Sequence, residues 1–229
     1  MGLVTPTFDA RGLASLVLLG TSSVLKVQND NFAIGLNGTT ISSASLPPPQ
    51  RSDGDGATSF VYTATGDVKI QVTYTVPPSA AFVTKAITVT STSTTYNITN
   101  VTLFAGVSLT LDGAPPASSA IASSHFGLKD YVLFQRWPAK TMGALLTAQN
   151  PFLDISAGYL SYAPAIVAPA GQSFAADAAH LGLHVLSNQT MLPPAAPLDT
   201  AEHAAMASCV AAAMSAPARA TSVLSLIHI

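Results

Sequence analysis

Charged residues are scarce in this sequence, cysteine occurs once, and no hydrophobic run is long. Only 9% of the 229 residues are charged, and the scattered Lys and Arg side chains form no basic run that would favour a nucleic-acid partner. The lone Cys209 excludes an intrachain disulfide and a multi-cysteine metal site. The longest apolar stretch, from Leu13 to Leu19, falls far short of the roughly 20 residues that span a bilayer. We therefore expect neither a nucleic-acid partner nor a membrane partner.

Alternation of apolar and polar residues is the dominant pattern that is present. Between Val68 and Val76 every second residue is apolar, and the residues between them are Lys, Gln or Thr. Such alternation is typical of a strand with one buried side and one solvent-facing side. Residues 83–90 repeat it after the turn signal Pro77-Pro78-Ser79, so the two segments predict an antiparallel hairpin.

Similar short segments recur along the chain. Further strands are predicted at residues 32–36, 39–46, 60–64, 101–111, 131–137, 143–148 and 181–186. Asn37-Gly38 joins the first two in the strongest short hairpin signal. The segments 46–56 and 114–124 are rich in Pro, Gly, Ala or Ser and are interpreted as loops. Many short strands separated by turn signals predict an all-β chain with a large antiparallel β-sandwich.

One helix is predicted near the end of the chain, from residue 200 to residue 215. Asp199 is a plausible N-cap and Glu202 completes a capping box. An apolar stripe runs along this helix at Met206, Val210 and Met214. The final residues 224–229 resemble a translated sequencing adapter.

These boundaries divide the chain into three parts. We expect a β-sandwich domain at 1–198, a linker helix at 199–216, and at 217–229 either the start of a missing domain or a sequencing artefact.

Four asparagines lie in N-x-S/T sequons: Asn37, Asn97, Asn100 and Asn188. Sequons mark the surface of a secreted glycoprotein if the source is a eukaryote. Chance occurrence in a chain rich in Ser and Thr is the alternative. The interpretation favoured here is an extracellular protein or one of the secretory pathway.

Several loose motifs occur in a recognisable order. They are Phe8–Leu16, then Tyr74, Pro77 and Lys85, then Gln149–Phe152, Phe174–Asp177 and Leu181–Leu183, followed by the linker helix. In this order the sequence resembles, over most of its length, the N-terminal β-supersandwich domain of α-galactosidase-like glycoside hydrolases. The resemblance implies a galactose-mutarotase-like sandwich followed by a catalytic (β/α)8 barrel, whose first strand would begin near residues 221–224. It implies an enzyme whose catalytic carboxylates lie outside this chain.

The residues themselves nominate no catalytic group, metal ligand set or cofactor site. Glycoside hydrolysis needs two carboxylates about 5–9.5 Å apart, whereas the aspartates here lie mostly at turns and Glu202, the only glutamate, serves as a cap. His180 and His184 are four residues apart, but on a strand that spacing separates them by about 13 Å. No third ligand accompanies them, so no metal site is expected.

Sugar contact is the remaining chemistry that the sequence supports. The candidates are Trp137 with Arg136, Gln149 with Asn150, and Asp177. An aromatic face suits the apolar side of a sugar ring, while amides and carboxylates bond its hydroxyls. The structural alternatives are a core or interdomain anchor for Trp137, a turn for the two amides, and a loop cap for Asp177.

The leading hypothesis is thus a non-catalytic sandwich domain of a glycoside hydrolase that supports the barrel and contacts carbohydrate. The alternative is a free-standing module, either carbohydrate-binding or of a structural or adhesion type. A mutarotase-like activity would need a His and Glu pair in a cleft, for which Glu202 on the terminal helix is badly placed.

Overall fold

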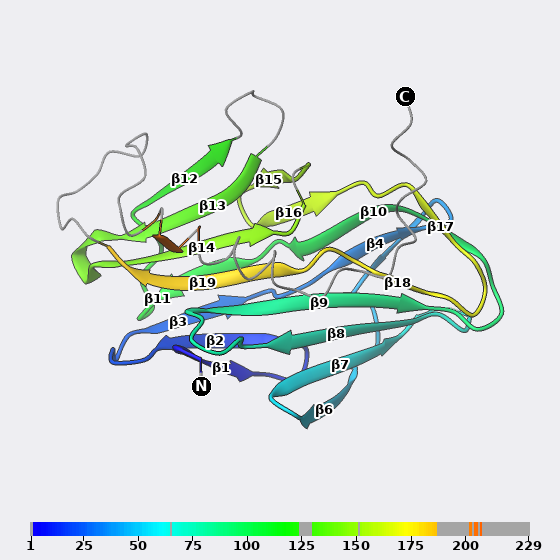
Figure 1. The fold of residues 1–229 in the computed structure, drawn as a ribbon, viewed down its shortest axis with the longest axis horizontal. Helices are drawn as coiled ribbons and strands as arrows, with labels where there is room; N and C mark the ends of the chain where they lie inside the picture. Colours follow the sequence, from blue (N-terminus) through cyan, green and yellow to red (C-terminus); the bar gives the residue numbers. More distant parts are fainter. Residues whose placement is uncertain are drawn as a thin grey trace.

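The chain folds as an all-β sandwich, which confirms the predicted fold class (Figure 1). The computed structural model describes residues 2–64, 66–123, 130–150, 152–186, 202, 204–205 and 207. The last four of these are helical and belong to the predicted linker helix. The rest of that helix, Cys209, the sequon at Asn188 and residues 217–229 lie outside the described residues. No helix among the described residues is long and apolar enough to cross a membrane.

A nine-stranded antiparallel sheet forms one layer. In spatial order it contains β12 (Ser118–Ser123), β13 (Asp130–Trp137), β14 (Met142–Ala148), β19 (Ala179–Val185), β9 (Phe82–Thr90), β8 (Lys69–Thr75), β7 (Ala57–Thr63) and β6 (Gln50–Gly54), and β18 (Ser173–Ala175) pairs with the far end of β9. A single 3-10 turn, η1 (Pro138–Lys140), joins β13 to β14.

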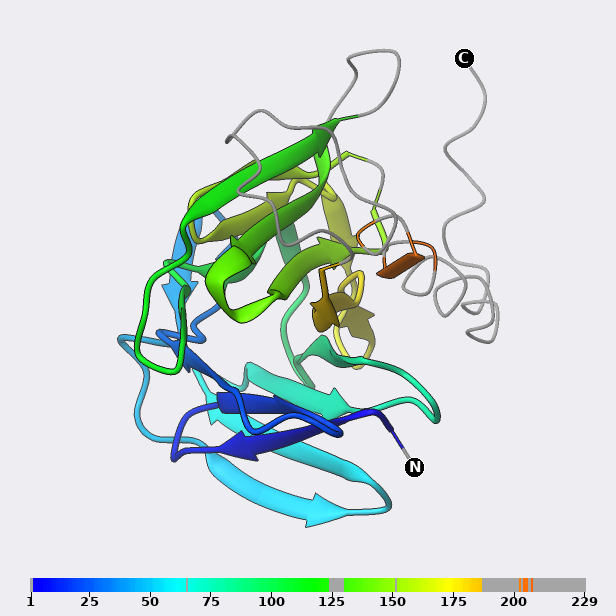
Figure 2. The ribbon, with the colours of Figure 1, turned by 90° about the vertical axis from the view of Figure 1, so that its left-hand side faces the viewer.

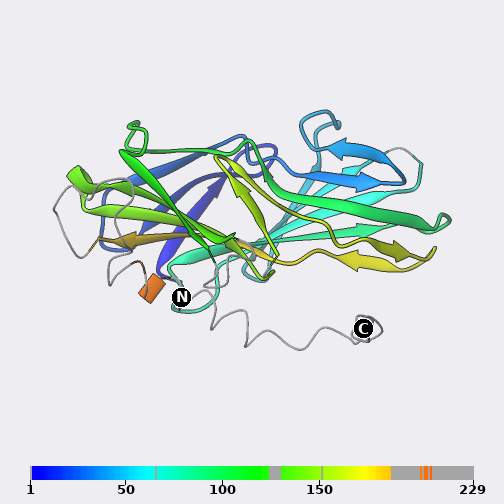
Figure 3. The same cartoon turned by 90° about the horizontal axis from the view of Figure 1, so that it is seen from above.

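Two smaller sheets form the opposite layer, one toward each end of the molecule (Figure 3). The four-stranded sheet contains β1 (Val4–Phe8), β2 (Leu13–Leu18), β3 (Val24–Gln28) and β11 (Ser108–Leu111). The six-stranded sheet contains β15 (Asp154–Ser156), β16 (Tyr159–Tyr162), β10 (Tyr96–Ala105), β4 (Ala33–Leu36) and β5 (Thr39–Ser42), with β17 (Ile166–Ala168) beside β10. The chain passes from one sheet to the other twice, from β3 to β4 and from β10 to β11.

One apolar core fills the space between the layers and draws residues from all three sheets. The inward positions of β8 and β9 are Ile70, Val72 and Tyr74, and Val83, Lys85, Ile87 and Val89, all at most 2% exposed. The predicted hairpin is therefore confirmed, with Val72 opposite Ile87 in an antiparallel register. The Asn37-Gly38 hairpin between β4 and β5 is confirmed as well, and both turn residues have positive φ as a type I′ turn requires.

Two segments that were predicted to be loops contain strands. Residues 46–56 include β6 and residues 114–124 include β12, the two outermost strands of the nine-stranded sheet. An edge strand pairs on one side only, so it tolerates Gly, Ser and Asp, which are unfavourable in a central strand. The strand predicted at 101–111 is divided at Gly106, whose φ of +85° ends β10 before β11 begins in the other sheet.

A buried charge cluster ties the layers together. Asp30, in the connection from β3 to β4, accepts from Lys85 Nζ at 2.5 Å, Tyr74 Oη at 2.6 Å and the Leu13 N–H at 2.9 Å. The Lys85 and Asp30 side chains are 1% and 3% exposed. Burial lowers the pKa of Lys85, and the Asp30 carboxylate opposes that shift. Breaking such a buried pair from one side costs about 3–5 kcal/mol, because it strands the other charge.

Candidate functional site

Arg136 and Trp137, two of the predicted sugar contacts, lie at the end of β13 with buried side chains. Arg136 is fully buried and donates from Nε and Nη2 to the two carboxylate oxygens of Glu202, at 2.6 and 2.7 Å. Through these two bonds the Glu202 carboxylate holds its helix against the sheet. The predicted N-cap Asp199 lies outside the described residues. Trp137 is 4% exposed and donates from Nε1 to the Ala114 carbonyl oxygen at 3.0 Å. Neither side chain presents a surface that a sugar could reach in this structure.

The other three predicted contacts come together in space. β14 and β19 are antiparallel with Ala148 opposite Ala179, so the residues just after β14 lie beside those just before β19. This register places Gln149 and Asn150 next to Asp177. Asn150 Nδ2 donates to Asp177 Oδ2 at 2.8 Å, and all three residues are half-buried. We call these three residues the amide–carboxylate cluster.

His180 lies beneath this cluster and was not predicted to belong to it. It is 2% exposed, and its ring packs edge-on against Phe82 with centroids 5.0 Å apart. The Gln149 amide nitrogen lies 3.3 Å from His180 Nε2, and Thr84 Oγ1 lies 3.1 Å from Nδ1. Because an amide nitrogen only donates, Nε2 accepts and the ring proton resides on Nδ1. Burial lowers the pKa of His180 to about 4, so the imidazole is neutral at neutral pH.

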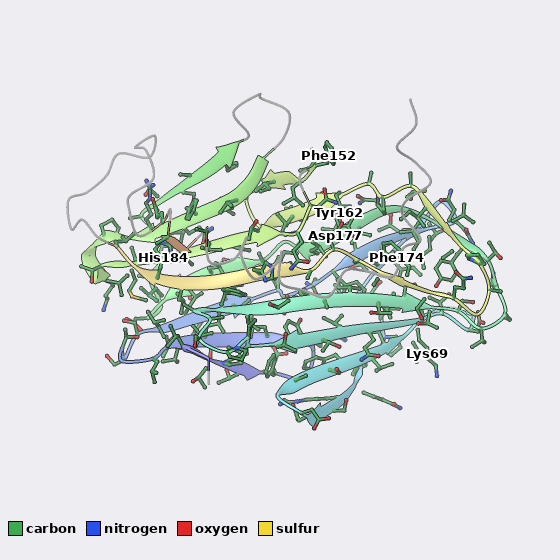
Figure 4. The ribbon with its side chains drawn as sticks, in the orientation of Figure 1. Lys69, Phe152, Tyr162, Phe174, Asp177 and His184 are labelled. Carbon is green, nitrogen blue, oxygen red and sulfur yellow. The ribbon has the colours of Figure 1, made fainter. Side chains whose placement is uncertain are left out.

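Two aromatic residues beside the cluster were also missed. Tyr162 Oη accepts the Asp177 N–H at 2.7 Å and so fixes the backbone that carries the carboxylate. Phe152 is 63% exposed, and its N–H donates to Asn150 Oδ1 at 2.7 Å. Figure 4 shows Asp177 and Tyr162 side by side near the middle of the molecule. The Asn-Pro-Phe triplet was a usable signal, since Asn before Pro favours the start of a turn.

The amide–carboxylate cluster and the adjoining residue Phe152 offer hydrogen-bonding groups and an exposed aromatic ring rather than a reactive centre. An oriented carboxylate, two amides and the ring of Phe152 are the group types that hold a sugar ring. The one imidazole, that of His180, is almost fully shielded from solvent and is therefore poorly placed to exchange protons with a substrate. Among the described residues, no three His, Cys, Asp or Glu side chains are grouped to hold a metal ion.

His184 lies on the same face of β19 as His180 but toward its other end. Its ring covers Gly143 on β14 so closely that a Cβ there would overlap it, and it packs edge-on against Phe134 at 6.1 Å. The strand geometry thus separates the two histidines as predicted. Phe134 and Phe82 belong to a second apolar cluster on this outer face of the sheet, against which Ala205 of the linker helix packs.

Three of the four sequon asparagines are exposed and lie close together on β4, β10 and their connections. Asn37 Oδ1 accepts the Asn97 N–H at 2.7 Å, and Asn100 pairs with Gly35 across the ladder. Their exposure is compatible with glycosylation, which stays a prediction.

Comparison with known proteins rests on structure alone. No known protein family and no curated protein matches the sequence. A solved structure of a polysaccharide lyase (BACCELL_00875) is similar, with a TM-score of 0.56 and 11% sequence identity. This chain shares its fold with one part of a larger carbohydrate-active enzyme. The match covers 90% of this chain and 34% of the lyase chain, so the chain spans about a third of the length of that protein.

Proposed function

We propose that this chain is a non-catalytic β-sandwich module of a carbohydrate-active enzyme, and that it contacts carbohydrate through the amide–carboxylate cluster. The observation that carries the proposal is the structural match, in which nearly the whole chain corresponds to one third of a polysaccharide lyase. The proposed contact surface consists of the Asn150–Asp177 pair and the exposed side chain of Phe152, whose backbone N–H donates to Asn150.

A finer version of the proposal concerns the rest of the enzyme. The ordered motifs from Phe8 to Leu183 favour a glycoside hydrolase whose catalytic barrel follows the linker helix, whereas the structural neighbour is a lyase. The ion pair between Arg136 and Glu202 supports a role in seating a following domain, because it fixes the start of that helix on the sheet. The exposed sequons support an extracellular location. A free-standing binding or adhesion module remains the alternative function.

Polysaccharide binding by the intact chain tests the proposal. Affinity electrophoresis against a panel of soluble polysaccharides should show retardation by at least one of them. Phe152→Ala should weaken that binding about tenfold, because the exposed ring is lost while the core is untouched. Tyr159→Ala is the matched control, since Tyr159 is another aromatic residue that is 51% exposed.

Two outcomes would contradict the proposal. Absence of retardation on every polysaccharide would argue for a structural or adhesion module. Equal weakening by the Phe152 and Tyr159 variants would show that the amide–carboxylate cluster is not the contact surface.

A further inference from the structure

A pocket of about 290 Å³ lies at the open side of the sandwich, remote in sequence from the amide–carboxylate cluster. It is bounded by β1, the edge of the four-stranded sheet, and by the β6–β7 hairpin at the edge of the nine-stranded sheet. Figures 1 and 2 both show these two edges on the same side of the molecule. Its volume is close to the lower limit of small-molecule pockets, about 300–1,000 Å³, so it has room for one small ligand.

The floor of this edge pocket is apolar and rigid. Pro6, Phe8, Val76, Val83 and Tyr74 line it. The half-buried ring of Phe8 packs against Tyr74 with centroids 5.2 Å apart. Tyr74 is itself fixed, since its hydroxyl donates to Asp30 in the buried charge cluster.

The rim of the edge pocket carries two carboxylates at the tip of the hairpin, Asp53 and Asp55. Asp53 Oδ1 accepts from Thr58 Oγ1 at 2.7 Å, and its Oδ2 accepts from Arg51 Nε at 3.0 Å. These hydrogen bonds lower the pKa of Asp53 and hold its carboxylate in one orientation. Arg51 is held in turn, because its guanidinium lies 5.5 Å from the centroid of the Phe8 ring.

Asp55 completes the rim. It occupies the turn of the hairpin with a φ of +49°, followed by Gly56 with a φ of +74°. None of the residues that line the pocket is basic. Arg51 is not a lining residue, but it pairs with Asp53 at this rim. Arg51, Asp53 and Asp55 together leave one net negative charge, which a ligand carboxylate would meet.

We propose that this edge pocket binds one neutral pyranose unit and discriminates against uronic acids. The apolar face of the sugar ring would lie on the floor formed by Phe8 and its neighbours. Vicinal hydroxyls would donate to the oriented carboxylate of Asp53, and Asp55 would exclude anionic sugars. The site rests on the proposed carbohydrate function but is separate from the amide–carboxylate cluster.

NMR titration of the full, isotope-labelled chain tests the site residue by residue. The probes are galactose, glucose, mannose and xylose, with glucuronate and galacturonate as the anionic counterparts. At least one neutral sugar should shift the amide resonances of Phe8, Gly54 and Gly56, and the uronates should leave them unchanged. Asp53→Ala should weaken the neutral sugar at least about tenfold, through loss of a charged hydrogen-bond acceptor.

Asp55→Asn is the second variant, and it is safe for the fold because Asn tolerates positive φ well. This variant should lower the ratio of the affinity for neutral sugar to the affinity for uronate severalfold. A purely structural role of Asp55 would leave that ratio unchanged. Asp154→Asn, at an exposed position on β15 in another sheet, is the control and should change neither affinity nor preference.

Each possible failure has a distinct meaning. Shifts confined to residues around Asn150 and Asp177 would overturn the edge pocket and leave the proposed function standing. Equal binding of uronates would overturn the discrimination. If no sugar shifts any amide resonance and no polysaccharide retards the chain in electrophoresis, both proposals are contradicted.

Discussion

At the scale of single residues, His180 makes the stability of this protein depend on pH. Its pKa of about 4 in the folded state lies below the value of about 6.5 expected in the unfolded chain. Between these values the unfolded state binds more protons than the folded state, so stability is lost as the pH falls. The contribution of the neutral His180 imidazole to stability is therefore complete only above about pH 6.5.

Urea unfolding at pH 7 and pH 4.5 measures this effect. His180 should contribute a loss of about 2–3 kcal/mol over that interval. Carboxylates also titrate between pH 7 and pH 4.5, so the wild-type chain must be compared with His180→Gln. The fall in unfolding free energy over this interval should be about 2–3 kcal/mol smaller for the variant. If the unfolding free energies of the wild-type chain and of His180→Gln fall equally with pH, then protonation of the His180 imidazole does not destabilise the fold.

At the scale of elements, Gly158 joins the two smaller sheets. Its carbonyl oxygen accepts from the N–H groups of Gly106 and Val107, both at 2.9 Å, where β10 gives way to β11. Its φ is +78°, and a Cβ there would lie 2.6 Å from the Val107 carbonyl oxygen. The position therefore needs glycine both for its backbone conformation and for its close approach to the neighbouring backbone.

Comparison of two alanine variants separates these requirements. Gly171 has the same φ of +78° but open space around its Cα. Gly171→Ala should cost about 1–2 kcal/mol, the ordinary penalty of a left-handed residue. Gly158→Ala should cost clearly more in the same chemical unfolding experiment, and equal losses would mean that the junction of the sheets yields to the added methyl group.

Strands with strong alternation were predictable, and the hairpin of β8 and β9 appears in the structure with the expected inward side. That alternation includes Lys85 among apolar residues, a usable sign of a buried ion pair. Its partner Asp30 lies in a connection 55 residues away, and no local pattern identifies it. The edge strands β6 and β12 were not predictable from propensity, because an edge depends on pairing with a distant neighbour.

Long-range packing also decides which of the predicted sugar contacts are accessible and which are buried. Gln149, Asn150 and Asp177 meet because β14 and β19 pair in one register. Their amide and carboxylate groups, which can bond sugar hydroxyls, made each of them noticeable in the sequence. Arg136 and Trp137 were noticeable as residue types that can contact sugar. Arg136 is buried against Glu202 of the linker helix, and Trp137 is buried in the main core. The edge pocket escaped prediction altogether, since it joins residues of five strands, β1, β6, β7, β8 and β9.

At the scale of the whole molecule, the Arg136–Glu202 pair fastens the linker helix to the outer face of the nine-stranded sheet (Figure 2). Both side chains are fully buried. Glu202→Gln should destabilise the protein by about 3 kcal/mol or more, because the Arg136 charge loses its carboxylate. It should also increase binding of a hydrophobic dye, since the cluster around Phe82 and Phe134 loses its cover.

A surface ion pair is the matched control for that variant. Lys140 and Asp112 are 3.3 Å apart with side chains 50% and 29% exposed, and Lys140→Gln should cost less than about 1 kcal/mol. Thermal unfolding with dye fluorescence measures both effects. Similar behaviour of the two variants would show that the linker helix is held by apolar contact alone.

The two ends of the nine-stranded sheet have unequal protection against self-association. β6 ends the sheet with Arg51 and Asp53, and charged side chains discourage pairing with another strand. β12 ends the other side, within the described residues, with the uncharged sequence Ser-Ser-Ala-Ile-Ala-Ser and an Ile121 that is 44% exposed. Fibrillar growth or sheet extension between copies would therefore start at β12, and concentrated samples are best protected by a charge at that edge.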